Sequence, residues 1–224
     1  MTKPRKPNAN LPHFHTGSFG PEEPSPSIQA LVYLWLTVQE AEDIYWQFQK
    51  SCIRNRQVLW SGMERKKAQK WADKRNFQTL TTALGPLLDP SHPDCPHHPK
   101  PSVGWKKYIH GASVIFAWYI SQGDLVTVLS QPPPQRFHPS GRTYYQMVEE
   151  PIVKGKMDNK PVEKIVVVHP TVGGKAEEFK YEMWPHDEFS LWTKNFGIQE
   201  IVIYWRKVKG EKKQQITKVL KVNS

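Results

Sequence analysis

The first half of the chain has apolar side chains at every third or fourth position, which is the spacing of one face of a helix. Ser61 and Glu64 also have the spacing of a capping box, so a helix is expected to begin at Ser61. Five prolines between residues 89 and 101 predict a loop. The helices expected from this pattern span 28–54, 61–75 and 105–121, with a shorter helical or irregular segment over 79–88.

The second half has short runs of β-branched and aromatic residues, which predict strands. These runs are nearly continuous, as in strands that are buried on both faces of a parallel sheet. A helix between the last two runs, closed by Gly197 as a left-handed cap, would complete a right-handed crossover. The expected strands span 125–129, 144–148, 165–168 and 201–205, and the expected helix spans 187–195.

Together the two patterns predict a mixed fold of the α/β or α+β class. A helical N-terminal half (28–121) would pack on a smaller half (122–208) with a four-stranded, mainly parallel sheet, and an active-site cleft would lie between them. Residues 1–27 are polar and rich in proline, so we expect a disordered leader. Residues 209–224 are expected to form a basic C-terminal tail.

Several classes of protein are disfavoured by composition. No apolar run is long enough to span a membrane, and the N-terminus lacks the apolar segment of a signal peptide. Cys52 and Cys95 are too few for a disulfide framework. We therefore expect no membrane span, and a location in the cytoplasm or export by a route without a classical signal peptide. The histidines and Cys95 of the 89–101 loop lack a second ligand cluster, so no metal site is expected.

The net charge of +10 raises the possibility of a polyanionic partner. Residues 206–221 hold seven basic residues and one acid, and so contribute +6 of that total. We interpret this segment as a solvated element with a turn at 209–212, and the alternative is contact with an acidic partner such as RNA, DNA or lipid. A nucleic-acid-binding or nuclease module, using a basic and aromatic surface, is the first alternative function for the whole chain.

Two local features suggest chemistry on a nucleotide. Trp60 precedes the expected start of a helix, where unpaired N–H groups favour a phosphate. Glu149 and Glu150 end the expected strand 144–148, and a carboxylate there could stabilise an oxocarbenium cation during glycosidic cleavage. The plain alternatives are that Trp60 is a core residue and that the two acids are solvated.

Taken in order, these features resemble the ADP-ribosyl cyclase and NAD glycohydrolase family over about residues 45–208. The resemblance rests on four motifs, and it continues through Ile165–His169 with Gly173-Gly174 and through the helix and strand expected over 187–205. The motifs are Leu59-Trp60-Ser61, Thr79-Leu80 followed by Gly85 and Asp89, Ser113-x-x-Phe116-Ala117 before Gly123, and Tyr145-x-x-Val148-Glu149.

This resemblance implies cleavage of the nicotinamide–ribose bond of NAD or NADP, to give nicotinamide and ADP-ribose with some cyclic ADP-ribose. NAD is then the substrate, and neither a cofactor nor a metal is needed. Glu149 would be the catalytic glutamate, and Trp60 would form an aromatic wall of the pocket. The other implied substrate-binding positions are Ser61 and Gly62 near the phosphates, Asp89 at the nicotinamide carboxamide, and Trp105, Ser113 and Tyr145.

The chain departs from the family pattern at three points. Thr81 stands where a glutamate is common, and Ile109 stands where the second pocket tryptophan is expected, with Trp105 one turn earlier. The disulfides of extracellular members are absent, which indicates an intracellular or toxin-like branch. These changes favour hydrolysis over cyclisation, and they leave open a catalytically inactive NAD-binding relative as the second alternative function.

Overall fold

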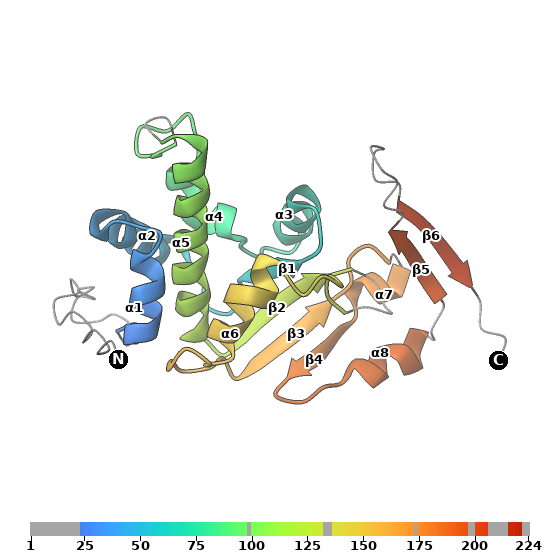
Figure 1. Cartoon of the computed structure of the whole chain (residues 1–224). Helices are drawn as coiled ribbons and strands as arrows, with labels where there is room; N and C mark the ends of the chain where they lie inside the picture. Colours follow the sequence, from blue (N-terminus) through green and yellow to red (C-terminus); the bar gives the residue numbers. More distant parts are fainter. Residues whose placement is uncertain are drawn as a thin grey trace, which may run out of the picture.

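A four-stranded sheet forms the centre of the computed structural model, which describes residues 23–97, 100–131, 136–172, 174–196, 200–205 and 215–220. The strands lie in the order β1-β2-β3-β4. The first three are parallel, and β4 runs antiparallel to β3 (Figure 1). Their bounds are Val58–Ser61 for β1, Leu125–Ser130 for β2, Lys164–Val168 for β3 and Lys180–Trp184 for β4. The expectation of a mixed fold with a mainly parallel four-stranded sheet is confirmed.

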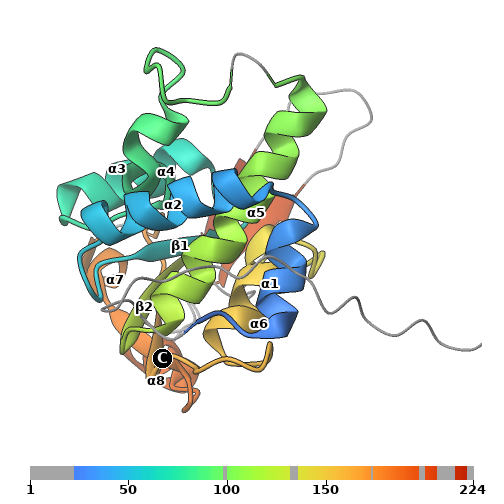
Figure 2. The same ribbon diagram turned by 90° about the vertical axis from the view of Figure 1, so that its left-hand side faces the viewer.

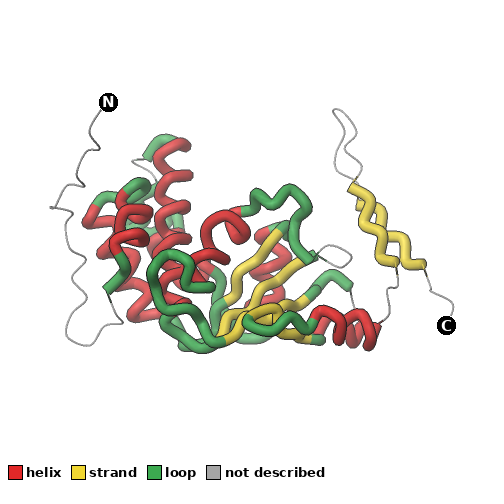
Figure 3. Tube along the Cα trace, turned by 60° about the horizontal axis from the view of Figure 1, so that its bottom comes forward, coloured by secondary structure: helices red, strands yellow, loops and turns green. Residues whose placement is uncertain are grey.

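Helices α1, α2, α4 and α5 pack against one another at one end of the sheet (Figures 2 and 3). The long helix α5 contacts both α1 and α2, and its inner face is almost entirely buried. The bounds are Pro26–Tyr33 for α1, Val38–Ser51 for α2, Arg65–Lys74 for α3, Leu80–Leu84 for α4, Gly85–Leu88 for the 3-10 turn η1 and Ser102–Ser121 for α5. The helix expected over 105–121 thus matches α5 to within three residues at its start.

The two faces of the sheet are covered by different helices because side chains alternate along each strand. Val58, Leu129 and Val168 face a small cluster that includes Trp71 of α3. Their neighbours on the opposite face, such as Leu59, belong to the main core with α5. The sheet is thus enclosed between α3 on one side and the helices of the main core on the other.

The expected helix over 28–54 is wrong in one respect, because the chain breaks it into α1 and α2. Thr37 caps α2, with its side chain accepting from the Glu40 N–H and the Glu40 carboxylate accepting from the Thr37 N–H at 2.9 Å. Leu34 lies at the break and is 63% exposed. A reciprocal cap satisfies N–H groups that a continuous helix would otherwise pair, so the break is stabilised locally.

The expected capping box at Ser61 is also wrong. Ser61 is the last residue of β1, and α3 begins at Arg65 with Glu64 as a cap residue whose side chain makes no capping hydrogen bond. Val58–Ser61 instead pairs with β2 along its whole length. The four-residue run is apolar enough to serve as the edge strand of the sheet.

The expected strand over 144–148 is wrong, since these residues are helical. Tyr145–Glu149 forms a π-helical turn, η2, that continues directly into α6 (Glu150–Val153). The segment connects β2 to β3, which are parallel neighbours, and such a connection must cross back over the sheet. A helix provides that crossover, whereas a strand over 144–148, added to the four strands of the sheet, would not.

The C-terminal part departs from the expected crossover. After β3 the chain forms α7 (Gly174–Glu178), then the antiparallel strand β4, and then α8 (Phe189–Phe196). Residues 201–205 belong to β5 (Glu200–Trp205), which pairs with β6 (Gln215–Leu220) in a separate two-stranded sheet. The expected strand–helix–strand unit within the main sheet is therefore wrong, although α8 lies close to where a helix was predicted.

Some expectations lie partly or wholly outside the described residues. These are the Gly197 cap, the turn at 209–212 and most of the leader, while α1 already begins at Pro26. The boundary expected between residues 208 and 209 falls between the paired strands β5 and β6. Within the described part of the chain, no helix has the length and apolar character that crossing a membrane requires.

Candidate functional site

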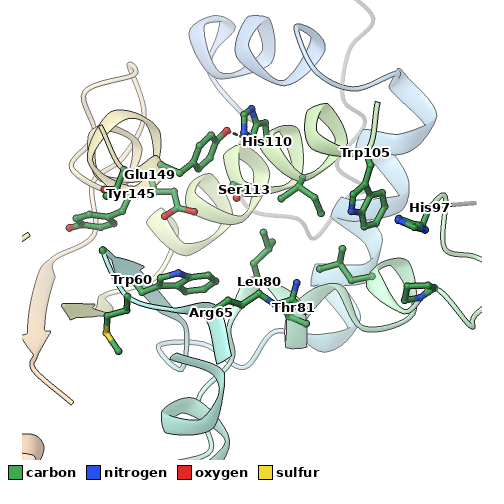
Figure 4. A pocket seen from close by; sticks show the side chains of 17 residues that line it. Trp60, Arg65, Leu80, Thr81, His97, Trp105, His110, Ser113, Tyr145 and Glu149 are labelled. Carbon is green, nitrogen blue, oxygen red and sulfur yellow. Dashed lines mark hydrogen bonds between the residues drawn. The ribbon is translucent and has the colours of Figure 1, made fainter. Parts of the chain in front are cut away.

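A pocket of about 630 Å³ opens between the end of β1, the α4–η1 region, α5 and the η2 turn (Figure 4). Trp60, Tyr145 and Glu149 lie toward one end, and Trp105 and His97 lie toward the other. The volume is within the range of sites that bind drug-sized ligands and cofactors. Six of the eight site residues expected from the sequence line this pocket: Trp60, Gly62, Trp105, Ser113, Tyr145 and Glu149.

Glu149 supplies the carboxylate of the pocket. It is only 8% exposed, and this burial raises the pKa of the carboxyl to about 8, although hydrogen bonding with Ser113 of α5 acts in the opposite direction. Glu150 has a different environment, because it forms an ion pair with Lys154 one turn later. The two adjacent acids therefore differ in role, with Glu149 in the pocket and Glu150 in a helix ion pair.

The choice of Glu149 over Glu150 came from the resemblance, and the strand 144–148 that was expected to carry it is wrong. In η2 the residues are wound as a helix, so Glu149 and Glu150 point in directions separated by the helical twist. Ser113 lies on the facing side of α5, within the pocket (Figure 4). The winding of η2, rather than strand pleating, aims Glu149 at the pocket.

Ser61 holds this turn in place and does not line the pocket. Its side chain is fully buried, and its hydroxyl lies 3.0 Å from the Thr143 hydroxyl just before η2. Thr143 in turn donates to the Gln146 side-chain carbonyl at 2.8 Å. Ser61 thus links the end of β1 to the start of the turn that carries Glu149, which is a positioning role instead of the phosphate contact expected for it.

Aromatic side chains form much of the pocket wall. Tyr144 donates its hydroxyl to the His110 carbonyl at 2.7 Å, and the two rings stack with centroids 4.6 Å apart. At the other end Trp105 stacks on Tyr108 at 5.3 Å and meets His97 edge-on at 4.7 Å. A half-buried indole fixed in this way offers a flat apolar surface to a ring of the ligand.

Asp89 lies outside the pocket, contrary to what the resemblance implied. It is exposed at the end of η1, where its carboxylate accepts from the Ser91 N–H at 2.9 Å and the Ser91 hydroxyl at 2.7 Å. These bonds hold the pKa of Asp89 below its usual value. Leu88 and Pro90, on either side of it, do line the pocket.

Gly62 and Arg65 form the wall beside Trp60. Gly62 has φ +70°, and a Cβ there would come within 3.0 Å of the Gln131 amide and 3.1 Å of His138, so a side chain is disfavoured both by conformation and by space. Arg65 begins α3, is exposed, and has no ion pair within the described residues. It is therefore available to bind an anionic group in the pocket.

Sequence reasoning missed several pocket residues. Arg65 and Tyr144 reach the pocket because β1 is a strand and 144–149 is helical, and both features were predicted otherwise. His110 lies on α5, which was predicted, but no motif singled it out. The departures Thr81 and Ile109 both line the pocket. Among the described residues, no three His, Cys, Asp or Glu side chains gather as metal ligands would.

The identity of the chain has to be argued from this pocket. The resemblance to the ADP-ribosyl cyclase and NAD glycohydrolase family stays a prediction from the order of four motifs. Comparisons of the chain with protein-family models, with curated proteins and with solved structures give no match.

Proposed function

We propose that this protein is an NAD glycohydrolase that cleaves the nicotinamide–ribose bond of NAD or NADP. The observation that carries the proposal is the buried carboxylate of Glu149 in a pocket walled by Trp60 and other aromatic rings. Nicotinamide is cationic in NAD and leaves as a neutral molecule, so its departure needs no general acid. What the reaction needs is negative charge near the anomeric carbon, where an oxocarbenium-like cation develops.

Each part of the pocket has a function in this proposal. Glu149 and Ser113 hold the ribose that reacts, and Trp60 stacks against the nicotinamide side. Arg65 binds the pyrophosphate, since a guanidinium pairs well with phosphate oxygens. Trp105 and His97 receive the adenine at the far end, which makes this pocket the active-site cleft of the enzyme.

The raised pKa of Glu149 fits a cationic substrate. Burial favours the neutral carboxyl of Glu149 in the free protein, and a bound nicotinamide ring would place a positive charge near it. An opposite charge within a few ångströms lowers a carboxyl pKa, so binding would favour the ionised form that the reaction uses. Water then captures the cation to give ADP-ribose. The adenine of the same substrate captures it in a minor path to cyclic ADP-ribose.

Nicotinamide release from NAD by the purified full chain tests this proposal. Products are separated by chromatography, and the Glu149→Gln variant purified in parallel identifies release that comes from a contaminating enzyme. We expect nicotinamide and ADP-ribose from the wild type, unchanged by EDTA. Loss of activity with EDTA and recovery with a divalent ion would overturn metal-free cleavage. Tight NAD binding without release at micromolar enzyme would identify an inactive NAD-binding relative.

A further inference from the structure

A second groove, of about 340 Å³, continues from the pocket along the surface of α3. It shares Arg65 and Thr81 with the pocket, and these two residues lie between the Glu149 end and the Trp105 end (Figure 4). The rest of the groove is lined by polar and charged side chains, namely Lys66, Gln69, Lys70, Asp73 and Lys74. A ligand in the pocket can therefore extend into the groove without crossing a wall of apolar residues.

Among the described residues, the cations along this groove are offset only in part, since Asp73 lies among them and Lys74 helps to lower the pKa of Glu178. Lys67 and Arg75, which do not line it, have acidic partners, Glu64 for the first and Glu177 and Glu178 for the second. Lys66, Lys70 and Lys74 are exposed and have no ion pair within the described residues. The single acid of α3, Asp73, accepts from the Gln69 amide at 2.7 Å. The groove thus presents positive charge to solvent.

The spacing of these lysines points to an anion as their partner. Positions 66, 70 and 74 are four residues apart, so the side chains lie on one face of α3 at intervals of about 6 Å. Like charges at this spacing repel one another and destabilise a helix. A bound phosphate would remove that repulsion, whereas water removes it only in part.

We propose that the α3 groove, lined by Arg65, Lys66, Lys70 and Lys74, binds a phosphate group carried on the adenosine ribose of the dinucleotide. This inference rests on the proposed function. A dinucleotide in the pocket can branch toward the groove at its adenosine ribose hydroxyls, and a phosphate there is either a 2′-monoester, as in NADP, or a 3′-phosphodiester to a following nucleotide. The groove therefore selects phosphorylated nicotinamide dinucleotides over NAD.

The test compares three substrates and three proteins at low and physiological salt. The substrates are NAD, NADP and NAD extended at its 3′-hydroxyl by a short oligonucleotide. The proteins are the wild type, the double variant Lys66→Gln/Lys70→Gln, and the control Lys156→Gln/Lys160→Gln. The control removes the same charge from exposed positions after α6 that do not line the pocket or the groove. Steady-state kinetics give kcat/KM for each combination of protein and substrate. Tryptophan fluorescence gives the affinity for each dinucleotide independently of turnover.

We expect the wild type to prefer a phosphorylated substrate over NAD by at least about tenfold in kcat/KM at low salt. The preference should fall about tenfold in the groove variant, stay within about twofold in the control, and weaken as salt rises. Preference for NADP identifies the 2′-phosphate as the source, and preference for the extended substrate alone identifies the 3′-diester.

Three other outcomes separate this inference from the proposed function. Equal kcat/KM for all three substrates, or a ratio that the groove variant leaves unchanged, would overturn the groove proposal while nicotinamide release still supports the enzyme. Tighter, salt-sensitive binding of phosphorylated dinucleotides without nicotinamide release would overturn the enzyme and support the groove. No binding of any dinucleotide would overturn both.

Discussion

Glu149 and His169 are both buried, titratable side chains that follow the parallel strands β2 and β3, yet they have different surroundings. Glu149 is 8% exposed and His169 is fully buried. Burial favours the neutral form of each, so the pKa of Glu149 is raised to about 8 and that of His169 is lowered to about 4. By burial and pKa alone, the two residues are equal candidates for a functional site.

The residues that surround Glu149 and His169 distinguish the two side chains. The His169 Nε2 lies 3.0 Å from the Tyr181 hydroxyl, and Trp192 packs edge-on against its ring at 5.4 Å, so it is enclosed by the core. Glu149 lines the pocket, and His169 does not. The comparison teaches that a perturbed pKa indicates a site only where a ligand can reach the group, and that a well-packed histidine can show a similar shift for structural reasons.

Removing the Glu149 charge should give the largest effect. We expect Glu149→Gln to lower kcat for nicotinamide release at least about a hundredfold, by analogy with loss of a group that stabilises transition-state charge. The matched variant Glu150→Gln breaks only the ion pair with Lys154 and should stay within about threefold of wild type. Near-normal turnover in Glu149→Gln would show that access to the pocket does not distinguish Glu149 from His169.

Thermal unfolding of Glu149→Gln shows whether its loss of activity comes from misfolding. Since the folded pKa of Glu149 lies above its usual value, its ionisation opposes folding, and stability is lost as pH rises from about 4.5 to about 8. The neutral glutamine should therefore be at least as stable as wild type at pH 8 by thermal unfolding. An inactive variant that is also less stable at this pH would point to a structural role.

The pH dependence of turnover should give the next largest effect. Because the proposed reaction uses ionised Glu149, kcat/KM for NAD should fall about tenfold per pH unit below about 8, the pKa of this carboxyl in the free protein. The kcat profile should break at a lower pH, since the cationic substrate stabilises the carboxylate in the complex. Stopped assays from pH 5 to 9 give both profiles. Identical breaks in kcat and kcat/KM would contradict an interaction between Glu149 and the nicotinamide ring.

A change at His169 should leave turnover almost unaffected. His169→Phe removes the ring nitrogen beside the Tyr181 hydroxyl, which also interacts with the Arg136 side chain, and should lower the free energy of unfolding by about 1 kcal/mol, the net contribution of one hydrogen bond. The kcat/KM of the folded variant should stay within about threefold of wild type. A hundredfold loss of kcat/KM in a folded His169→Phe protein would place this histidine in the mechanism.

The sequence pattern predicted regular elements well where packing and local spacing agree. α5 is long and strongly apolar, and β2 and β3 are continuous β-branched runs, so these were located to within a few residues. β4 reads Lys-Tyr-Glu-Met-Trp, and its two charged residues left no strong strand signal. β1 is a short edge strand whose last residue resembles a helix cap, and pairing with β2 overrides that local signal.

The candidate site was predicted best at residues whose side-chain type by itself suggests a function in the pocket. Trp60 and Glu149 were singled out by local features and by the resemblance, Ser113 by the resemblance alone, and all three line the pocket. Ser61 and Asp89 were not separable from pocket residues by sequence, because their hydrogen bonds to Thr143 and Ser91 depend on how the chain folds. Arg65 was missed for the same reason, since its access to the pocket follows from where β1 ends.

Because η2 is a π-helical turn, the direction of the Glu149 side chain depends on the pitch of this turn and not only on the number of residues that precede it. A π turn holds one residue more than the α-helical turn it replaces, so the residues that follow it are rotated relative to those before it. Two chains that place the same carboxylate in the same pocket can therefore differ by one position in their motif if only one of them carries the extra residue. A search based on fixed intervals between conserved positions would then pass over chains of this kind, whereas a search based on three-dimensional templates of side-chain atoms would retain them.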